Sequence, residues 1–142
     1  MREFMTIITE GQAADYLQGV FYHGTALEKG EGFRHTAYFT QNRNEATEYA
    51  WMDSEVDADP PMLIKVRLHC TNPAVLDWML LQDLAQNKEG RAKAAELMAA
   101  GHDVVISSTP GHDEVCVLDP SKIEVIEVIK LPYRDGTWPE AE

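Results

Sequence analysis

Two short segments in the first third of the chain hold side chains suited to binding a flat small molecule. His23 follows strand-forming residues, and Gly24 and Thr25 come directly after it. A glycine lets the backbone approach a ligand closely, and a threonine hydroxyl both donates and accepts hydrogen bonds. Tyr38 and Tyr49 lie 11 positions apart. Two tyrosine rings that face each other form a slot for a flat heteroaromatic ring, preferably an electron-poor or cationic one.

A carboxylate stands at the start of an apolar segment much further along the chain. Glu114 follows the residues PGHD and precedes the apolar residues VCVL. At the mouth of an otherwise buried strand, a carboxylate is placed for electrostatic or hydrogen-bonding work. Each residue also has a simpler interpretation: a lone histidine, two core tyrosines, or a charge at a strand end. The pattern indicates a site only when the three segments are taken together.

The elements that must position these residues follow from periodicity and turn chemistry. Asn42 is suited to cap a helix, and Glu45 three residues later completes an Asn version of the capping box. We therefore expect a strand at 20–22, a glycine-rich loop at 24–36 that bends around a ligand, a strand at 36–40 and a helix at 43–51.

The remaining pattern favours an α+β fold over a doubly wound parallel sheet, because strands outnumber strand-helix-strand units. The whole chain, 1–142, is expected to form one domain. The further expected elements are a short helix ending at Gly19, a strand at 62–70, a helix at 77–100 broken near Gly90, strands at 102–108, 114–119 and 123–131, and a frayed tail at 133–142.

Charge and composition exclude several classes of function. Acidic residues outnumber basic ones 24 to 12, which gives a net charge of -12. Such a field repels phosphate backbones and anionic membranes, so we expect no unspecific nucleic-acid binding and no membrane association. The first residues, MREFMTIITEGQ, lack the apolar core of a signal peptide, and Cys70 and Cys116 show no CxxC spacing. These features predict a cytoplasmic protein, in its producing cell or in a host cell, with two buried thiols.

Together the three segments resemble the ADP-ribosyltransferase superfamily, in the branch with a His-Tyr-Glu signature shared by poly(ADP-ribose) polymerases and diphtheria-type toxins. The family's first motif, a strand ending in Tyr-His-Gly-Thr, corresponds to residues 22–25. Its second, Tyr-Phe followed by a helix with another Tyr 11 positions after the first, corresponds to YFTQNRNEATEY, and its third to EVCVLDPSKI. The resemblance covers about residues 21–126.

This resemblance implies a fold and a set of roles. The implied fold is an ADP-ribosyltransferase-like split β-sheet sandwich with an NAD cleft and flanking helices. His23 would hold the adenosine-side ribose, Gly24 the nicotinamide amide, and Tyr38 and Tyr49 the two faces of nicotinamide. Glu114 would bind the 2'-hydroxyl of the nicotinamide ribose. The remaining implied NAD-binding residues are Tyr22, Thr25 and Arg34, the last through the pyrophosphate.

The implied activity is transfer of ADP-ribose from NAD to an acceptor with release of nicotinamide, and no metal. Breaking the glycosidic bond builds positive charge on the ribose, as in glycoside hydrolysis. Glu114 would stabilise that charge, with His23 and Tyr38 as the other catalytic residues. Mono-ADP-ribosylation of a macromolecule is expected, with a protein favoured as acceptor because of the chain's acidity. A phage or bacterial effector would fit this size.

Alternatives from other classes remain. The first is a non-catalytic protein of the same fold that binds NAD or a protein partner, and the second is an RNA 2'-phosphotransferase, which would want basic residues around the phosphate. A Cys-His nucleophile using Cys116 would require an exposed thiol, whereas its surroundings predict burial. A metal site would use His69, Cys70, His112, Asp113 and Cys116, whose spacing matches no standard zinc pattern.

Overall fold

Seven strands and three helices are assigned in the computed structural model, which describes residues 15–26, 36–57 and 59–139. Residues 15–17 are also helical. The strands are β1 (Val20–Thr25), β2 (Ala37–Thr40), β3 (Met62–Leu68), β4 (Pro73–Leu76), β5 (Val104–Ser107), β6 (Glu114–Val117) and β7 (Ile123–Lys130). The helices are α2 (Arg43–Asp57), α3 (Trp78–Asp83) and α4 (Lys88–Ala99).

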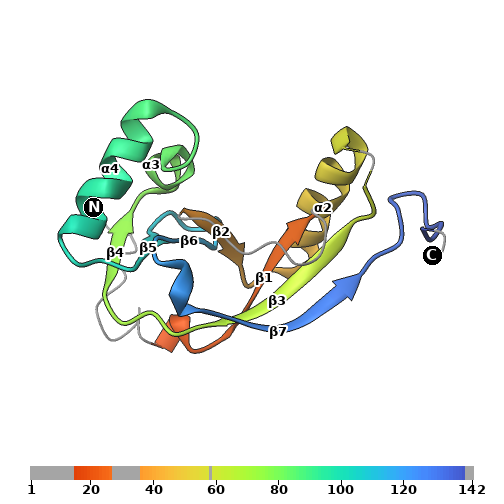
Figure 1. Cartoon of the computed structure of the whole chain (residues 1–142), viewed down its shortest axis with the longest axis horizontal. Coiled ribbons are helices and arrows are strands. Elements are labelled where there is room, and N and C mark those ends of the chain that lie inside the picture. Colours follow the sequence, from red (N-terminus) through yellow and green to blue (C-terminus); the bar gives the residue numbers. More distant parts are fainter. Residues whose placement is uncertain (1–14, 27–35, 58, 140–142) are drawn as a thin grey trace.

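The strands form one sheet in the order β4-β5-β6-β2-β1-β3-β7 (Figure 1). Neighbouring strands are antiparallel, except that β4 and β5 run parallel. A mixed sheet with helices packed on it confirms the α+β class. No helix in the described part of the chain has both the length and the apolar composition needed to cross a bilayer.

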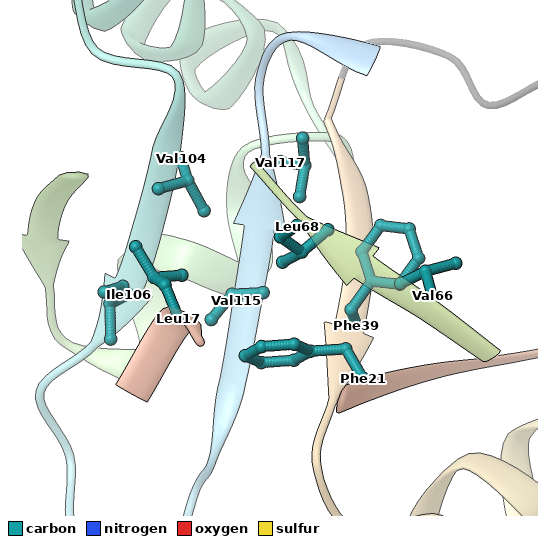
Figure 2. Packing of buried hydrophobic residues seen from close by; sticks show 9 residues of the cluster. All are labelled: Leu17, Phe21, Phe39, Val66, Leu68, Val104, Ile106, Val115 and Val117. Atoms are coloured by element: carbon teal, nitrogen blue, oxygen red, sulfur yellow. The ribbon is translucent and has the colours of Figure 1, made fainter. Parts of the chain in front are cut away.

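Successive side chains of a strand point to opposite faces, so the buried residues are divided between the two faces of the sheet. One face carries the largest core cluster, in which Phe21 of β1, Phe39 of β2 and Val115 of β6 pack together (Figure 2). The neighbouring residues in sequence, Tyr22 and Tyr38 among them, belong to clusters on the other face.

The helices cover that second face at two separate places. Ala46 and Ala50 of α2 pack on Leu63 of β3, and α3 and α4 pack on the cluster around Val105 and Cys116 at the other end of the sheet. Figure 1 shows α2 and the α3-α4 pair as two groups on the same side of the sheet. The middle strands β1, β2 and β6 therefore lie between the two groups of helices.

The three strands predicted after residue 100 are present as β5, β6 and β7, and Asn42 caps α2 by accepting a hydrogen bond from the Glu45 amide at 3.0 Å. However, α2 continues to Asp57, beyond the predicted end at residue 51. No glycine or proline interrupts this stretch before Pro60, so nothing in the backbone stops the helix.

The helix predicted over 77–100 breaks earlier than Gly90. α3 ends at Asp83, and Asn87 caps α4 by accepting a hydrogen bond from the Gly90 amide at 2.7 Å. Gly90 is buried inside α4, and a Cβ placed there would lie 1.7 Å from the Asp83 carbonyl oxygen. The glycine marks a close helix contact instead of a break. The short strand β4 is absent from the sequence prediction.

The described part of the tail after β7 is not frayed, contrary to the sequence prediction. The Trp51 indole donates a hydrogen bond to the Pro132 carbonyl at 2.8 Å. Arg134 donates to Glu55 at 2.8 Å and to Glu48 at 2.9 Å, and its guanidinium lies 5.2 Å from the centre of the Trp51 ring. These contacts anchor the tail to the outer side of α2 (Figure 1).

Candidate active site

A cavity of about 370 Å³ lies on the helix-covered face of the sheet, between α2 and α3. This volume falls within the usual range of small-molecule sites. It is lined by Tyr22, His23 and Gly24 of β1, Tyr38, Phe39 and Thr40 of β2, Ala46, Tyr49 and Asp53 of α2, Gln82 and Gln86 on the α3 side, and Glu114 of β6.

The cavity brings together the three predicted segments. Antiparallel pairing of β2 with β6 places Thr40 opposite Glu114, which sets the carboxylate beside the strand that carries Tyr38. Six predicted site residues line the cavity: Tyr22, His23, Gly24, Tyr38, Tyr49 and Glu114. Thr25 is not among the lining residues and is only 1% exposed. Arg34 lies outside the described residues.

Glu114 is a buried carboxylate with two hydrogen-bond donors. Glu114 is only 7% exposed. The Trp78 indole N–H donates a hydrogen bond to its Oε1 at 2.7 Å. A second hydrogen bond joins it to Tyr49. Burial raises the pKa of Glu114 above its ordinary value, the nearby charge of Glu45 also raises it, and the hydrogen bonds from Trp78 and Tyr49 act against this increase.

Trp78 is positioned by the helix cap at Asp77 and by the ring of His112. No motif in the sequence predicts its role. Asp77 caps α3 by accepting a hydrogen bond from the Leu80 amide at 3.0 Å, which fixes Trp78 as the first residue of the helix. The indole stacks on the His112 ring, with centroids 4.1 Å apart and an angle of 21° between the planes. Only the cap at Asp77 is a signal visible in the sequence.

The two tyrosines reach the cavity from different elements. The Tyr38 hydroxyl donates to the Gln82 carbonyl at 2.8 Å and accepts from the Ala85 amide at 3.0 Å, which ties its ring to the end of α3. Tyr49 is 39% exposed, and burial together with the charge of Glu114 raises the pKa of its hydroxyl to about 12. Tyr49 is therefore protonated at neutral pH and donates to Glu114.

His23 bridges a place where the sheet opens. β1 pairs with β3 along its whole length but with β2 at a single position, Tyr22 opposite Thr40. Across this gap, His23 Nδ1 lies 2.7 Å from the Tyr38 carbonyl oxygen, and because a carbonyl only accepts, Nδ1 carries the proton. Burial lowers the pKa of His23. The neutral ring then has its acceptor lone pair at Nε2.

The glycine at position 24 allows close packing of α2, in addition to the predicted approach of a ligand to the backbone. A Cβ at this position would lie 1.8 Å from the Ala46 carbonyl oxygen of α2. The absence of a side chain therefore lets α2 approach β1 closely, which brings Tyr49 and Asp53 over the sheet. Gly24 lines the cavity as well.

A cation that no sequence motif indicates lies near the cavity. Arg43, the first residue of α2, places its guanidinium 5.9 Å from the centre of the Tyr22 ring. Tyr22 lines the cavity, so Arg43 lies beside one of its walls. In the sequence, Arg43 looks like any surface arginine at the start of a helix.

Cysteines and metal-ligand residue types are the other candidates for chemistry in this chain. Both cysteines are free thiols, and burial raises the pKa of Cys70 to about 12 and the pKa of Cys116 further. Neither is poised as a thiolate nucleophile. Within residues 15–26, 36–57 and 59–139, no three His, Cys, Asp or Glu side chains gather closely enough to hold a metal ion.

Comparisons with known proteins do not extend these observations. No protein-family model, no curated protein and no solved structure matches the chain. Arguments about function therefore rest on the site itself.

Proposed function

We propose that the protein is an ADP-ribosyltransferase that binds NAD in this cavity, releases nicotinamide and transfers ADP-ribose to an acceptor. One observation carries the proposal: residues from three segments far apart in sequence line one cavity, with a buried, doubly hydrogen-bonded Glu114 on its wall. Any of these residues alone has a simpler explanation. Their convergence on one cavity supports the proposal of an NAD site there.

The proposed fold is the split sheet of this superfamily. Two features support it: the single paired position between β1 and β2, and the placement of α2 and α3 on one face with the cavity between them. His23 occupies the opening between these strands through its hydrogen bond to the Tyr38 backbone.

The nicotinamide ring of NAD carries a positive charge, and the lining of the cavity suits such a ring. Tyr38 and Tyr49 offer aromatic faces, and Asp53 and Glu114 are carboxylates. Aromatic faces and carboxylates both attract a flat cation. In the proposed complex the two rings enclose nicotinamide, and Gly24 meets its amide through the backbone.

Glu114 is the residue proposed to promote bond cleavage. The bond between the ribose and nicotinamide breaks, its electron pair goes to the ring nitrogen, and nicotinamide leaves as a neutral molecule. The positive charge that develops on the ribose is stabilised by the carboxylate, which Trp78 and Tyr49 hold in one orientation. The acceptor then bonds to the ribose carbon and loses a proton.

The anionic pyrophosphate of NAD needs a cation, and two arginines are proposed for it. Arg34 is the residue suggested by the sequence, and Arg43 is the described residue whose guanidinium lies beside the cavity wall. A guanidinium is well matched to phosphate oxygens. His23 is proposed to hold the adenosine-side ribose.

The proposal is tested by incubating a bacterial lysate with adenylate-labelled NAD and either the wild-type protein or Glu114→Gln. Wild type is expected to label macromolecules and to release nicotinamide, and Glu114→Gln to lose about a hundredfold in rate, the usual cost of one preorganised group. The matched control is Glu127→Gln, at an exposed position of β7.

The outcomes separate the candidate functions. Nuclease and protease treatment of the labelled material identifies the acceptor class, for which a protein modified by single ADP-ribose units in the cytoplasm is proposed. Binding of NAD without nicotinamide release would favour the non-catalytic alternative. Absence of NAD binding, measured by calorimetry with the wild-type protein, would refute the proposal.

A further inference from the structure

Exposed apolar side chains lie in a stripe on α2 that begins at the cavity. Tyr49, Met52 and Val56 are 39%, 52% and 83% exposed. Their spacing of three and four residues places them on one side of the helix. Tyr49 lines the cavity, so the stripe begins at the cavity and continues along an exposed side of α2.

The opposite side of the cavity has a matching feature on α3. Met79 is 67% exposed and lies one turn before Gln82, which lines the cavity. Figure 1 shows α2 and α3 on the same side of the sheet. We use the name mouth surface for the exposed apolar residues of the two helices that flank the cavity, Met52, Val56 and Met79.

The charge on these two helices has one dominant sign. Along α2 and α3 the sequence has six carboxylates and a single base, Arg43. Glu48 and Glu55 are paired with Arg134, whereas Glu45 is close enough to the cavity to raise the pKa of Glu114. Carboxylates thus outnumber bases on the two helices that carry the exposed apolar side chains, and methionine side chains adapt readily to the shape of a partner.

We propose that the mouth surface docks a basic protein, which places apolar side chains on Met52 and Met79 and cationic side chains near carboxylates of α2 and α3. The charge complementarity selects a basic partner, and the exposed methionines give the contact its apolar centre. Identification of this partner with the acceptor of ADP-ribose rests on the proposed function, whereas the docking itself does not.

The test measures binding without NAD, at physiological ionic strength, by calorimetry. Purified core histones serve as the basic probe and serum albumin as the acidic probe. The double variant Met52→Ser/Met79→Ser is compared with Val128→Ser, a change of an exposed apolar residue on β7. All three positions are exposed, so the fold should tolerate the changes, which circular dichroism checks.

Wild type and Val128→Ser are expected to bind histones and not albumin, and the double variant to bind histones about tenfold more weakly. Three results would overturn the proposal: equal histone binding by the double variant, equal binding of albumin, or no histone binding by wild type. Nicotinamide release from NAD alone is measured in parallel and should be unchanged in the double variant. Docking without any nicotinamide release would refute the proposed function and leave the docking surface intact.

Discussion

At the residue scale, Glu114 is subject to opposing effects. Burial and the charge of Glu45 favour its neutral form, whereas the hydrogen bonds from Trp78 and Tyr49 favour the carboxylate. A residue meant to stabilise a cation must be ionised, so the two donors are needed for the proposed chemistry. Trp78 therefore positions Glu114 and also governs its charge.

The first prediction concerns Trp78→Phe, which retains a ring to stack on His112 but removes the N–H donor. The pKa of Glu114 should rise further, so the acid limb of the pH–rate profile for nicotinamide release moves to higher pH. The rate at neutral pH should fall about tenfold to a hundredfold, as expected for losing a hydrogen bond to a charged group worth about 1.5–3 kcal/mol.

The control for this change is Trp138→Phe, because Trp138 is exposed and lies in the tail. Its pH profile should match that of wild type. If Trp78→Phe lowers the rate without moving the acid limb, Trp78 acts through packing and not through its hydrogen bond.

The second prediction is that Glu114→Gln stabilises the fold while it removes activity. The pKa of Glu114 is raised in the folded state, so the ionised form costs stability at pH values above that pKa, and the cost disappears as pH falls below the ordinary value of 4.5. The melting temperature of Glu114→Gln should exceed that of wild type by about 2–5 °C near pH 8 and should equal it near pH 4. A lower melting temperature near pH 8 would contradict this account.

At the element scale, the cavity depends on two helices held at fixed places on one face. α3 is tied to the sheet through the Tyr38 hydroxyl, and α2 approaches β1 because Gly24 has no side chain. The tail secures the outer side of α2 through Arg134. Each helix is therefore positioned by contacts from segments distant in sequence.

The third prediction tests the contact between α4 and the end of α3 with Gly90→Ala. Helix propensity alone predicts stabilisation by about 1 kcal/mol. The added Cβ would lie 1.7 Å from the Asp83 carbonyl oxygen, so we expect destabilisation instead, by about 1–3 kcal/mol. Urea unfolding measures the free energy. Arg91→Ala, at an exposed position of the same helix, should change it little, and a more stable Gly90→Ala would disprove the close contact.

At the scale of the whole molecule, the net charge of -12 acts on both association and stability. Like charges repel one another in the compact state, and dissolved salt screens this repulsion. The same excess of acidic groups favours the basic partner proposed for the mouth surface.

The fourth prediction follows from this repulsion. Raising the ionic strength from about 20 to 300 mM should increase the melting temperature by a few degrees, because the Debye length shortens. Sodium chloride and choline chloride should have equal effects, since screening depends on ionic strength and not on a bound cation. A melting temperature that falls or stays constant would show that the charge is already balanced locally.

The sequence alone predicts most of the elements and six of the twelve residues that line the cavity. His23, Tyr38, Tyr49 and Glu114 were chosen from local motifs, and all four line it. Alternation along the strands and the cap at Asn42 are also local signals, readable without tertiary structure.

Tertiary structure decided what local signals do not encode. Thr25 follows Gly24 directly and yet does not line the cavity, whereas Trp78, 36 residues from Glu114, donates to its carboxylate. The close approach at Gly90 is equally invisible in the sequence, where a glycine predicts a helix break. Periodicity is set by neighbouring residues along the chain, but the contacts of a side chain are set by which distant strands pair and how closely helices pack on them.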